Sequence, residues 1–275
     1  TEHYVICTNA GEPYAEWCGN LLDRLLTGFL IHWRGKPLSL EKPTDPLPVI
    51  VFSSPKEFAQ FAAKDAGAAT AQSKGYYSVR TNRIVLYDLT AGPDSEPAKT
   101  SADVARKIAA SPFNVATVVH EATHQIAFNS GMHTRYADNP VWLTEGMAMY
   151  FETPDLRNRT GWRTIGQLNR GRLREFKKTL PNRDSPNSLM TLIGNDERLT
   201  TAQTARDAYA EAWAFTYFLV KKHRKQYEDY LHALSQKKPL RWNDPKERLS
   251  EFRAAFGDDL GKLDQEFLRY FARIR

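Results

Sequence analysis

Two histidines and a glutamate stand close together in the pentapeptide His120-Glu121-Ala122-Thr123-His124. On a helix, residues four apart lie on one face, one turn above the other, so both imidazoles can reach a single ion. Glu121 then points beside that ion, where its carboxylate can take a proton from a metal-bound water. This spacing is typical of zinc hydrolases, and the surrounding elements must position these side chains accordingly.

The residues around the pentapeptide predict a helix with clear ends. Ser111 is a suitable N-cap, Pro112 fits the first helical position, and Gly131 stands just past the last turn. Apolar residues recur at helical spacing between these ends, at Val115, Val118, Val119, Ala122 and Ile126. We therefore expect a helix that is packed along one side and presents both histidines on another.

A second helix offers a third metal ligand. It is expected to begin at Asn139-Pro140 and to end before Pro154, and it carries Glu145. Zinc in hydrolases usually has three protein ligands and an open position for water. Gly146 is costly in a helix interior, which indicates a close approach between helices. Glu145 could thereby be brought against the first helix.

Another histidine competes with Glu145 as the third ligand. His133 follows His124 by nine residues, in what the pattern indicates is a turn. A metzincin-type site would need a histidine six residues after His124, and Ser130 stands there instead. The sequence therefore favours Glu145 over His133.

The remaining elements predict an α+β fold. Strands are expected over residues 3–8 and 47–53, and a hairpin over 75–88 that turns at Thr81-Asn82. Further helices are expected at about 14–34, 55–63 and 102–109, and later ones at about 163–178, 187–193, 202–223, 225–236, 245–255 and 260–273. We expect a small mixed sheet with helices in an α/β subdomain, residues 1–135, and an all-α subdomain, residues 136–275.

Composition bears on the partners of the protein, on its relation to membranes and on its location. The 275 residues carry a formal charge of +6, for which a solvated basic surface is favoured over an acidic partner. No apolar run approaches the ~20 residues that a membrane-spanning helix needs. The first residue is not Met, which fits either a removed signal peptide or a trimmed chain, and we expect an exported protein. Cys7 and Cys18 are expected either to form a local disulfide, as in an exported protein, or to be two buried thiols.

A basic run follows Pro154 and contains one tryptophan, Trp162. Its charged residues are Arg157, Arg159, Arg163, Arg170, Arg172, Arg174, Lys177 and Lys178. A site for single-stranded nucleic acid would combine such charges with several aromatic side chains on which bases stack. We therefore expect a solvated face and no nucleic-acid partner.

The two helices together resemble a known family. The pentapeptide followed by Trp142-Leu-Thr-Glu145-Gly-Met-Ala-Met-Tyr-Phe-Glu152 is similar to the gluzincin metallopeptidases, the thermolysin-like clan, and most of all to its peptidase MA-like branch. The resemblance implies that His120, His124 and Glu145 bind zinc and that Glu121 is the general base. It also implies an oxyanion donor from the helical half, for which Tyr209 is the candidate. Tyr209 could equally be a core aromatic stacked with Trp213 and Tyr217.

Two departures from the family pattern bear on the site. The family commonly has a carboxylate four residues after the third ligand, where it orients a zinc-bound histidine, and Met149 occupies that position. A backbone carbonyl or Glu152 is expected to take its place. The Gly-x-Met-Glu-Asn block with which the related aminopeptidases read a substrate's amino terminus is absent from this sequence. Exopeptidase activity is therefore not supported.

These observations predict a zinc-dependent endopeptidase that acts on a peptide or protein substrate. An extended peptide could add to Arg83–Tyr87 if that segment is an edge strand. The alternative is a catalytically idle zinc-containing protein that binds a peptide or an anionic polymer. The oligomeric state stays open.

Overall fold

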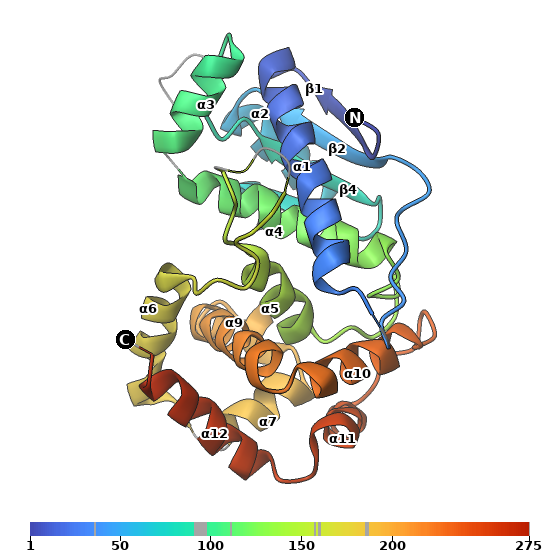
Figure 1. The fold of residues 1–275 in the computed structure, drawn as a ribbon, viewed down its shortest axis with the longest axis vertical. Coiled ribbons are helices and arrows are strands. Elements are labelled where there is room, and N and C mark those ends of the chain that lie inside the picture. The colour runs from blue at the N-terminus through green and yellow to red at the C-terminus, as the bar shows by residue number, and fades with distance from the viewer. Residues whose placement is uncertain are drawn as a thin grey trace. The chain divides into compact units, whose positions relative to one another are not determined.

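The computed structural model of the protein contains two compact units (Figure 1). The residues that the structure describes are 1–35, 37–90, 98–110, 112–156, 158, 161–184 and 187–274. Unit 1 comprises Thr1–Arg34, Leu40–Ser130 and Phe151–Ile165, and unit 2 comprises Gly35–Ser39, Gly131–Tyr150 and Gly166–Arg275. The predicted α+β class, with a small mixed sheet and a helical C-terminal half, is confirmed.

The units differ from the two continuous segments that the sequence suggested, 1–135 and 136–275. Residues 35–39 belong to unit 2, a further boundary falls at 130/131, and residues 151–165 return to unit 1. Aromatic packing explains the return: the ring centroids of Phe151 and Phe29 lie 5.0 Å apart. A Cβ added to Gly28 would stand 2.9 Å from the Cβ of Trp162, so only glycine allows this approach. Such long-range packing leaves no local signal in the sequence.

Unit 1 contains a four-stranded mixed sheet in the order β1-β2-β4-β3. Its strands are β1 (Tyr4–Thr8), β2 (Leu47–Phe52), β3 (Gly75–Ser78) and β4 (Arg83–Tyr87). β1 and β4 each pair with β2 in parallel, whereas β3 and β4 form the predicted antiparallel hairpin. Asn82 has φ +57°, a left-handed conformation that asparagine tolerates in turns.

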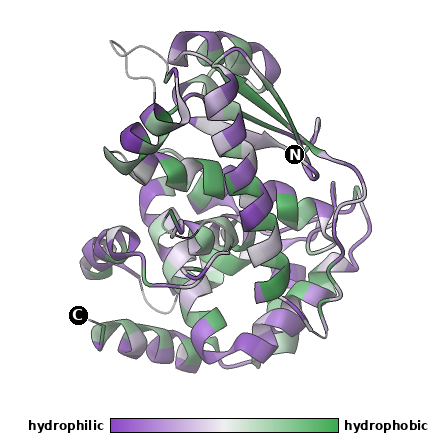
Figure 2. Cartoon of the chain, turned by 45° about the horizontal axis from the view of Figure 1, so that its top comes forward, coloured by the Kyte–Doolittle hydropathy of each residue, from purple (hydrophilic) through white to green (hydrophobic). Residues whose placement is uncertain are grey.

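The expectation that Arg83–Tyr87 is an edge strand is wrong, because β4 lies between β2 and β3. Ile84, Val85 and Leu86 are all fully buried, so both faces of this strand are covered. Figure 2 shows that the strands are largely hydrophobic. An uninterrupted apolar run is typical of a strand that is buried on both faces. That signal was present in the sequence, and it argued for a central strand.

Helices cover both faces of the sheet. Those of unit 1 are α1 (Glu12–His32), α2 (Pro55–Asp65), α3 (Ser101–Ala110) and α4 (Pro112–Asn129), with a 3-10 turn at Thr70–Gln72. Phe58 of α2 packs with Tyr76 and Val85 on one face. On the other, a Cβ at Gly75 would lie 3.6 Å from the Thr117 side chain of α4. α4 is therefore fixed against the strands.

The helix predicted around the pentapeptide is α4. Each residue of its predicted apolar stripe is fully buried: Val115, Val118, Val119, Ala122 and Ile126. Gly131, just past the helix, has φ +87°, which glycine adopts readily. The predicted N-cap, Ser111, lies outside the described residues, as do Arg157 and Arg159 of the basic run.

Unit 2 is helical around one buried helix. All residues of α5 (Val141–Phe151) except Phe151 belong to unit 2. The other helices of unit 2 are α6 (Arg170–Thr179), α7 (Asn187–Gly194), α8 (Glu197–Thr200), α9 (Ala205–Lys222), α10 (Arg224–Ser235), α11 (Pro245–Phe256) and α12 (Leu260–Ala272), with a 3-10 turn at Leu180–Asn182. Every residue from Ala210 to Val220 of α9 is buried. The sequence missed α8, and α6 begins later than predicted because Asn169 caps it.

Gly146 makes the close helix approach that its position predicted, but with another partner. A Cβ there would stand 2.1 Å from Thr216 Oγ1 and 2.8 Å from the Ala212 carbonyl oxygen, both on α9. The glycine therefore fits α5 to α9 within unit 2.

The remaining global expectations concern cysteines and membranes. Cys7 is exposed and Cys18 is buried, and both are free, so they form neither the disulfide nor a pair of buried thiols. Burial raises the pKa of the Cys18 thiol to about 12. Among the helices that the structure describes, none is long and apolar enough to cross a membrane, in agreement with the sequence.

Candidate metal centre

α4 brings the imidazoles of His120 and His124 together in an edge-to-face arrangement. Their Nε2 atoms lie 3.2 Å apart, and the ring planes meet at 79°. Two nitrogens bound tetrahedrally to one zinc at about 2.0–2.1 Å stand about 3.3–3.4 Å apart. His124 is 9% exposed, so the pair is largely withdrawn from solvent. The two nitrogens thus have a spacing that one ion can bridge.

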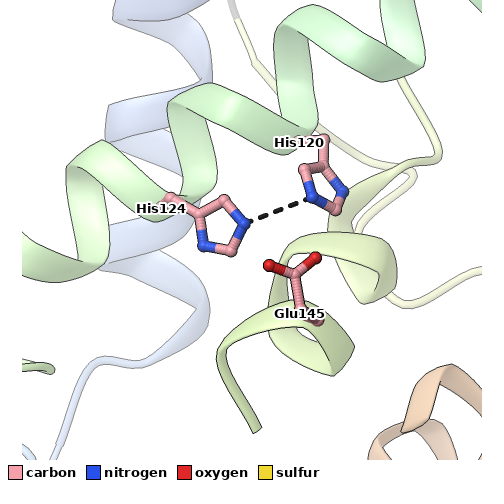
Figure 3. A group of neighbouring side chains, drawn as sticks. All are labelled: His120, His124 and Glu145. Carbon is pink, nitrogen blue, oxygen red and sulfur yellow. Dashed lines mark hydrogen bonds between the residues drawn. The ribbon is translucent and has the colours of Figure 1, made fainter. Parts of the chain in front are cut away.

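The carboxylate of Glu145 joins the two imidazoles. Ligand atoms of His120, His124 and Glu145 all lie within 4.8 Å of one another. Figure 3 shows the Glu145 side chain, carried by α5, pointing toward the histidines of α4. Two imidazole nitrogens and one carboxylate oxygen are a donor set that suits zinc. These three residues therefore form a group that could hold a metal ion, and within the described part of the chain His133 is not a member of it.

Glu121 is held by the edge strand of the sheet. Its Oε2 accepts a hydrogen bond from the backbone N–H of Tyr77 at 2.8 Å. Because β3 is the edge strand, this N–H points away from β4 and toward α4. The bond fixes the orientation of the carboxylate that the sequence assigns as the base.

A polar network fastens the hairpin to α4, and no pattern in the sequence predicted it. The Tyr77 hydroxyl donates to Asn82 Oδ1 at 2.9 Å, and Asn82 exchanges amide hydrogen bonds with Asn129 at 2.8–2.9 Å. Gln125 Nε2 donates to the carbonyl of Asn82 at 2.9 Å. The Tyr77 ring also stacks on Phe128, with centroids 5.8 Å apart. These contacts fix the strand that holds Glu121.

Glu152 contacts the Nδ1 side of the His120 ring, opposite the nitrogen that faces His124. Its Oε1 lies 2.9 Å from Nδ1 of His120, and its side chain is 6% exposed. A carboxylate in this position fixes the ring orientation and leaves Nε2 to face an ion. Of the two replacements that the sequence left open for the acid missing at Met149, the structure brings Glu152 against the ligand. Met149 itself is fully buried.

Two tyrosines belong to different units: Tyr76 to unit 1 and Tyr209 to unit 2. Tyr76 is a core residue whose hydroxyl donates to Asp65 Oδ2 at 2.8 Å. Tyr209 lies on α9 and is partly exposed, whereas its helix neighbours Trp213 and Tyr217 are buried. The assignment of Tyr209 as the oxyanion donor stays a prediction.

The tryptophan of the basic run is structural. Trp162 is 8% exposed, and the Arg24 guanidinium lies 5.8 Å from its ring centroid. Because this ring packs on α1, it is not available for stacking with a base. The basic side chains Arg170 to Lys178 lie on or near α6, in unit 2.

The fold and the site together define a mixed α+β protein with a His-Glu-x-x-His candidate metal centre and a carboxylate from a second helix. Residues 114–241, just under half of the chain, match the profile of a family described as "Protein of unknown function (DUF1570)". The matched segment contains the pentapeptide, Glu145 and Glu152. No curated protein matches the chain.

Proposed function

We propose that the protein is a zinc-dependent hydrolase of the gluzincin type that cleaves internal peptide bonds. The observation that carries this proposal is the 3.2 Å separation of the two Nε2 atoms, with Glu145 completing the group. The three side chains supply the ligand number and types of a catalytic zinc site. The order of the motifs along the chain, which resembles that of the gluzincins, supports the same conclusion.

Each residue of the centre has a distinct task. His120, His124 and Glu145 would hold the ion, which when bound lowers the pKa of its water and polarises the substrate carbonyl. Glu121 takes a proton from the attacking water and later delivers it to the leaving amine. Glu152 keeps the His120 ring in the orientation that directs Nε2 to the ion. Tyr209 remains the candidate donor for the developing oxyanion.

A peptide would not be held by addition to β4, because that strand is central. The edge strand beside β4 is β3, and two of its outward groups are engaged within unit 1. The N–H of Tyr77 donates to Glu121, and the carbonyl of Gly75 accepts from the Ser73 hydroxyl at 3.0 Å. The substrate class therefore rests on the metal centre and not on the sheet.

The test is zinc content together with the Glu121→Gln variant, assayed on an unstructured protein substrate. Glutamine can still accept the Tyr77 hydrogen bond, but it cannot take a proton. We expect the variant to keep its zinc and to lose about 10²- to 10⁴-fold in cleavage rate. Glu16→Gln, an exposed carboxylate on α1, is the matched control and should cleave like the wild type.

Two results would contradict the proposal. If the wild type and Glu121→Gln cleave equally, Glu121 is not the base. If neither cleaves while zinc stays bound, the protein is the idle zinc-containing binder that the sequence left as the alternative.

A further inference from the structure

Three large hydrophobic side chains are exposed on two loops of unit 2. Tyr136 is 44% exposed, Leu240 75% and Trp242 62%. Tyr136 belongs to the loop between α4 and α5, and the other two belong to the loop between α10 and α11. We call these three residues the loop patch.

The two loops form one surface. The backbone N–H of Leu240 donates to the carbonyl of Tyr136 at 2.7 Å. The ammonium of Lys237 lies 3.0 Å from Asp138 Oδ2 and 2.7 Å from Glu251 Oε2, so one cation joins the loops to α11. The loop patch is therefore held at a defined place.

Local geometry does not explain the residue types of the loop patch. Tyr136 has φ +61° and Leu240 φ +63°, a left-handed conformation that costs free energy for bulky residues and that glycine or asparagine adopts more easily. Burial does not explain them either, because the side chains face solvent. The remaining reason for apolar side chains here is contact with something outside the chain.

Basic side chains surround the loop patch. Leu240 is flanked in sequence by Lys238 and Arg241, both exposed. The guanidinium of Arg135 lies 5.5 Å from the ring centroid of Tyr136. The nearby acids Asp138 and Glu251 are both paired with Lys237, and the exposed Glu247 lies 3.7 Å from the guanidinium of Arg241. The surface therefore combines apolar side chains with positive charge.

The small size of the loop patch distinguishes between partners. The other exposed large hydrophobics among the described residues, Val5, Ile31 and Leu156, belong to unit 1. A stable protein interface uses about 20–30 residues a side. By contrast, tryptophan and tyrosine with nearby lysine and arginine suit the boundary of an anionic bilayer, where a few apolar side chains and a few charges act together.

We propose that the loop patch binds peripherally to anionic lipid bilayers. Leu240 and Trp242 enter the headgroup region, Tyr136 lies at its boundary, and Arg135, Lys238 and Arg241 contact lipid phosphates. This contact places unit 2 at a membrane surface and does not depend on the peptidase proposal.

The experiment is cosedimentation of the full chain with vesicles of phosphatidylcholine alone or mixed equally with phosphatidylglycerol. We expect binding to the mixed vesicles that weakens as salt is raised, and little binding to phosphatidylcholine. Removing two basic residues in Lys238→Gln/Arg241→Gln should lower the partition coefficient about 30-fold. The matched control, Lys56→Gln/Lys64→Gln, removes two exposed lysines of α2 in unit 1 and should bind like the wild type.

Leu240→Gly separates binding from folding. Glycine is favoured at φ +63° and keeps the backbone hydrogen bond, so the melting temperature should stay equal or rise. Binding should fall about tenfold or more, because a large apolar side chain no longer leaves water. Ile31→Ser, which removes a side chain that is 58% exposed in unit 1, should bind normally.

Fluorescence gives an independent measurement. Of the six tryptophans, Trp33, Trp142, Trp162 and Trp213 are buried and Trp17 is partly buried, so Trp242 should dominate any blue shift on vesicle addition. Trp242→Phe should abolish the shift. Three results would overturn the proposal: no binding to mixed vesicles, equal binding to both kinds of vesicle, or binding that neither Leu240→Gly nor Lys238→Gln/Arg241→Gln reduces.

Discussion

The two units use their charged side chains in opposite ways. In unit 2, acids are matched with permanent cations: the Arg248 guanidinium contacts Asp138 and, at 2.9 Å, Asp196. In unit 1, the groups around His120 and His124 are imidazoles and carboxylates, which offer lone pairs and carry positive charge only when a histidine is protonated. In the Arg248 cluster the acids already have cationic partners from the chain. The groups around His120 and His124 instead have the composition of a cation-binding site.

A second cluster in unit 2 repeats the matched arrangement. Arg183 pairs with Glu211 at 2.7 Å and with Asp264, and all three side chains are at most 4% exposed. Ser188 and Arg198 also contact Glu211. Charges buried this deeply are tolerated because each is paired and hydrogen-bonded. The difference between the units teaches that the balance of donors and acceptors, more than burial, separates a structural cluster from a candidate metal centre.

The largest effect that would test this comparison comes from breaking a matched cluster. Arg248→Ala leaves Asp138 buried without its guanidinium partner and should lower the free energy of unfolding by about 3–5 kcal/mol. Urea unfolding measures the loss. Arg206→Ala, which breaks an exposed pair with Glu175, should leave the free energy of unfolding almost unchanged because solvent screens the pair. Zinc affinity of the folded protein should be the same in both variants, and a fall in affinity with Arg248→Ala would show that the clusters are not separate in role.

A smaller effect is expected from Glu152→Gln. Glutamine preserves size but supplies no charge to the His120 ring, so zinc affinity should fall about 10- to 100-fold, as for other carboxylates behind a ligating histidine. Competition with a chromophoric chelator measures this. Glu175→Gln is the control, because that carboxylate lies on α6 and contacts only cations among its described ion pairs. Unchanged zinc affinity in Glu152→Gln would mean that its contact with His120 serves folding alone.

The smallest effect is a change in the acid limb of stability. Burial raises the pKa of Asp138, but hydrogen bonds from Arg248 and Lys237 outweigh it, so the folded-state pKa lies below the ordinary 3.8. The unfolded chain then binds the proton first, and the stabilisation is complete above the ordinary value and lost as the pH falls through the folded one.

Asp138→Asn should therefore show a flatter decline of the urea midpoint between about pH 5 and pH 3 than the wild type. Parallel curves for the two proteins would mean that Asp138 does not titrate in this window. The urea midpoint of each protein is expressed relative to its own value at about pH 5, because losing the Asp138 charge also lowers stability at that pH.

Local sequence patterns were sufficient for much of this structure. Helical spacing and capping residues predicted α4 and α5, and Glu145 was selected over His133 because it lies on the second helix and His133 in a turn. These features depend on residues that are near one another in the chain, where periodicity and turn chemistry act directly.

Contacts between distant residues were not predictable in the same way. The hydrogen bond from Tyr77 to Glu121 depends on β3 lying at an edge of the sheet, whereas the sequence suggested Arg83–Tyr87 as a possible edge strand. The close approach at Gly146 was expected, but only the fold shows that α9 is its partner. A single sequence can indicate that a residue makes a close contact, but not which distant residue is its partner.

The return of residues 151–165 to unit 1 bears on how the protein is made. Phe29 and Gly28 lie on α1, near the beginning of the chain, while the aromatic side chains that cover them, Phe151 and Trp162, are translated more than a hundred residues later. The ribosome therefore synthesises α5 before the packing of unit 1 can be completed. Until then, the apolar surface of α1 around Gly28 and Phe29 stays uncovered. A gene cut at codon 135 would encode a fragment whose α1 surface is never covered by Phe151 and Trp162. Dependence on chaperones should be greatest while the residues between α1 and Trp162 are being synthesised.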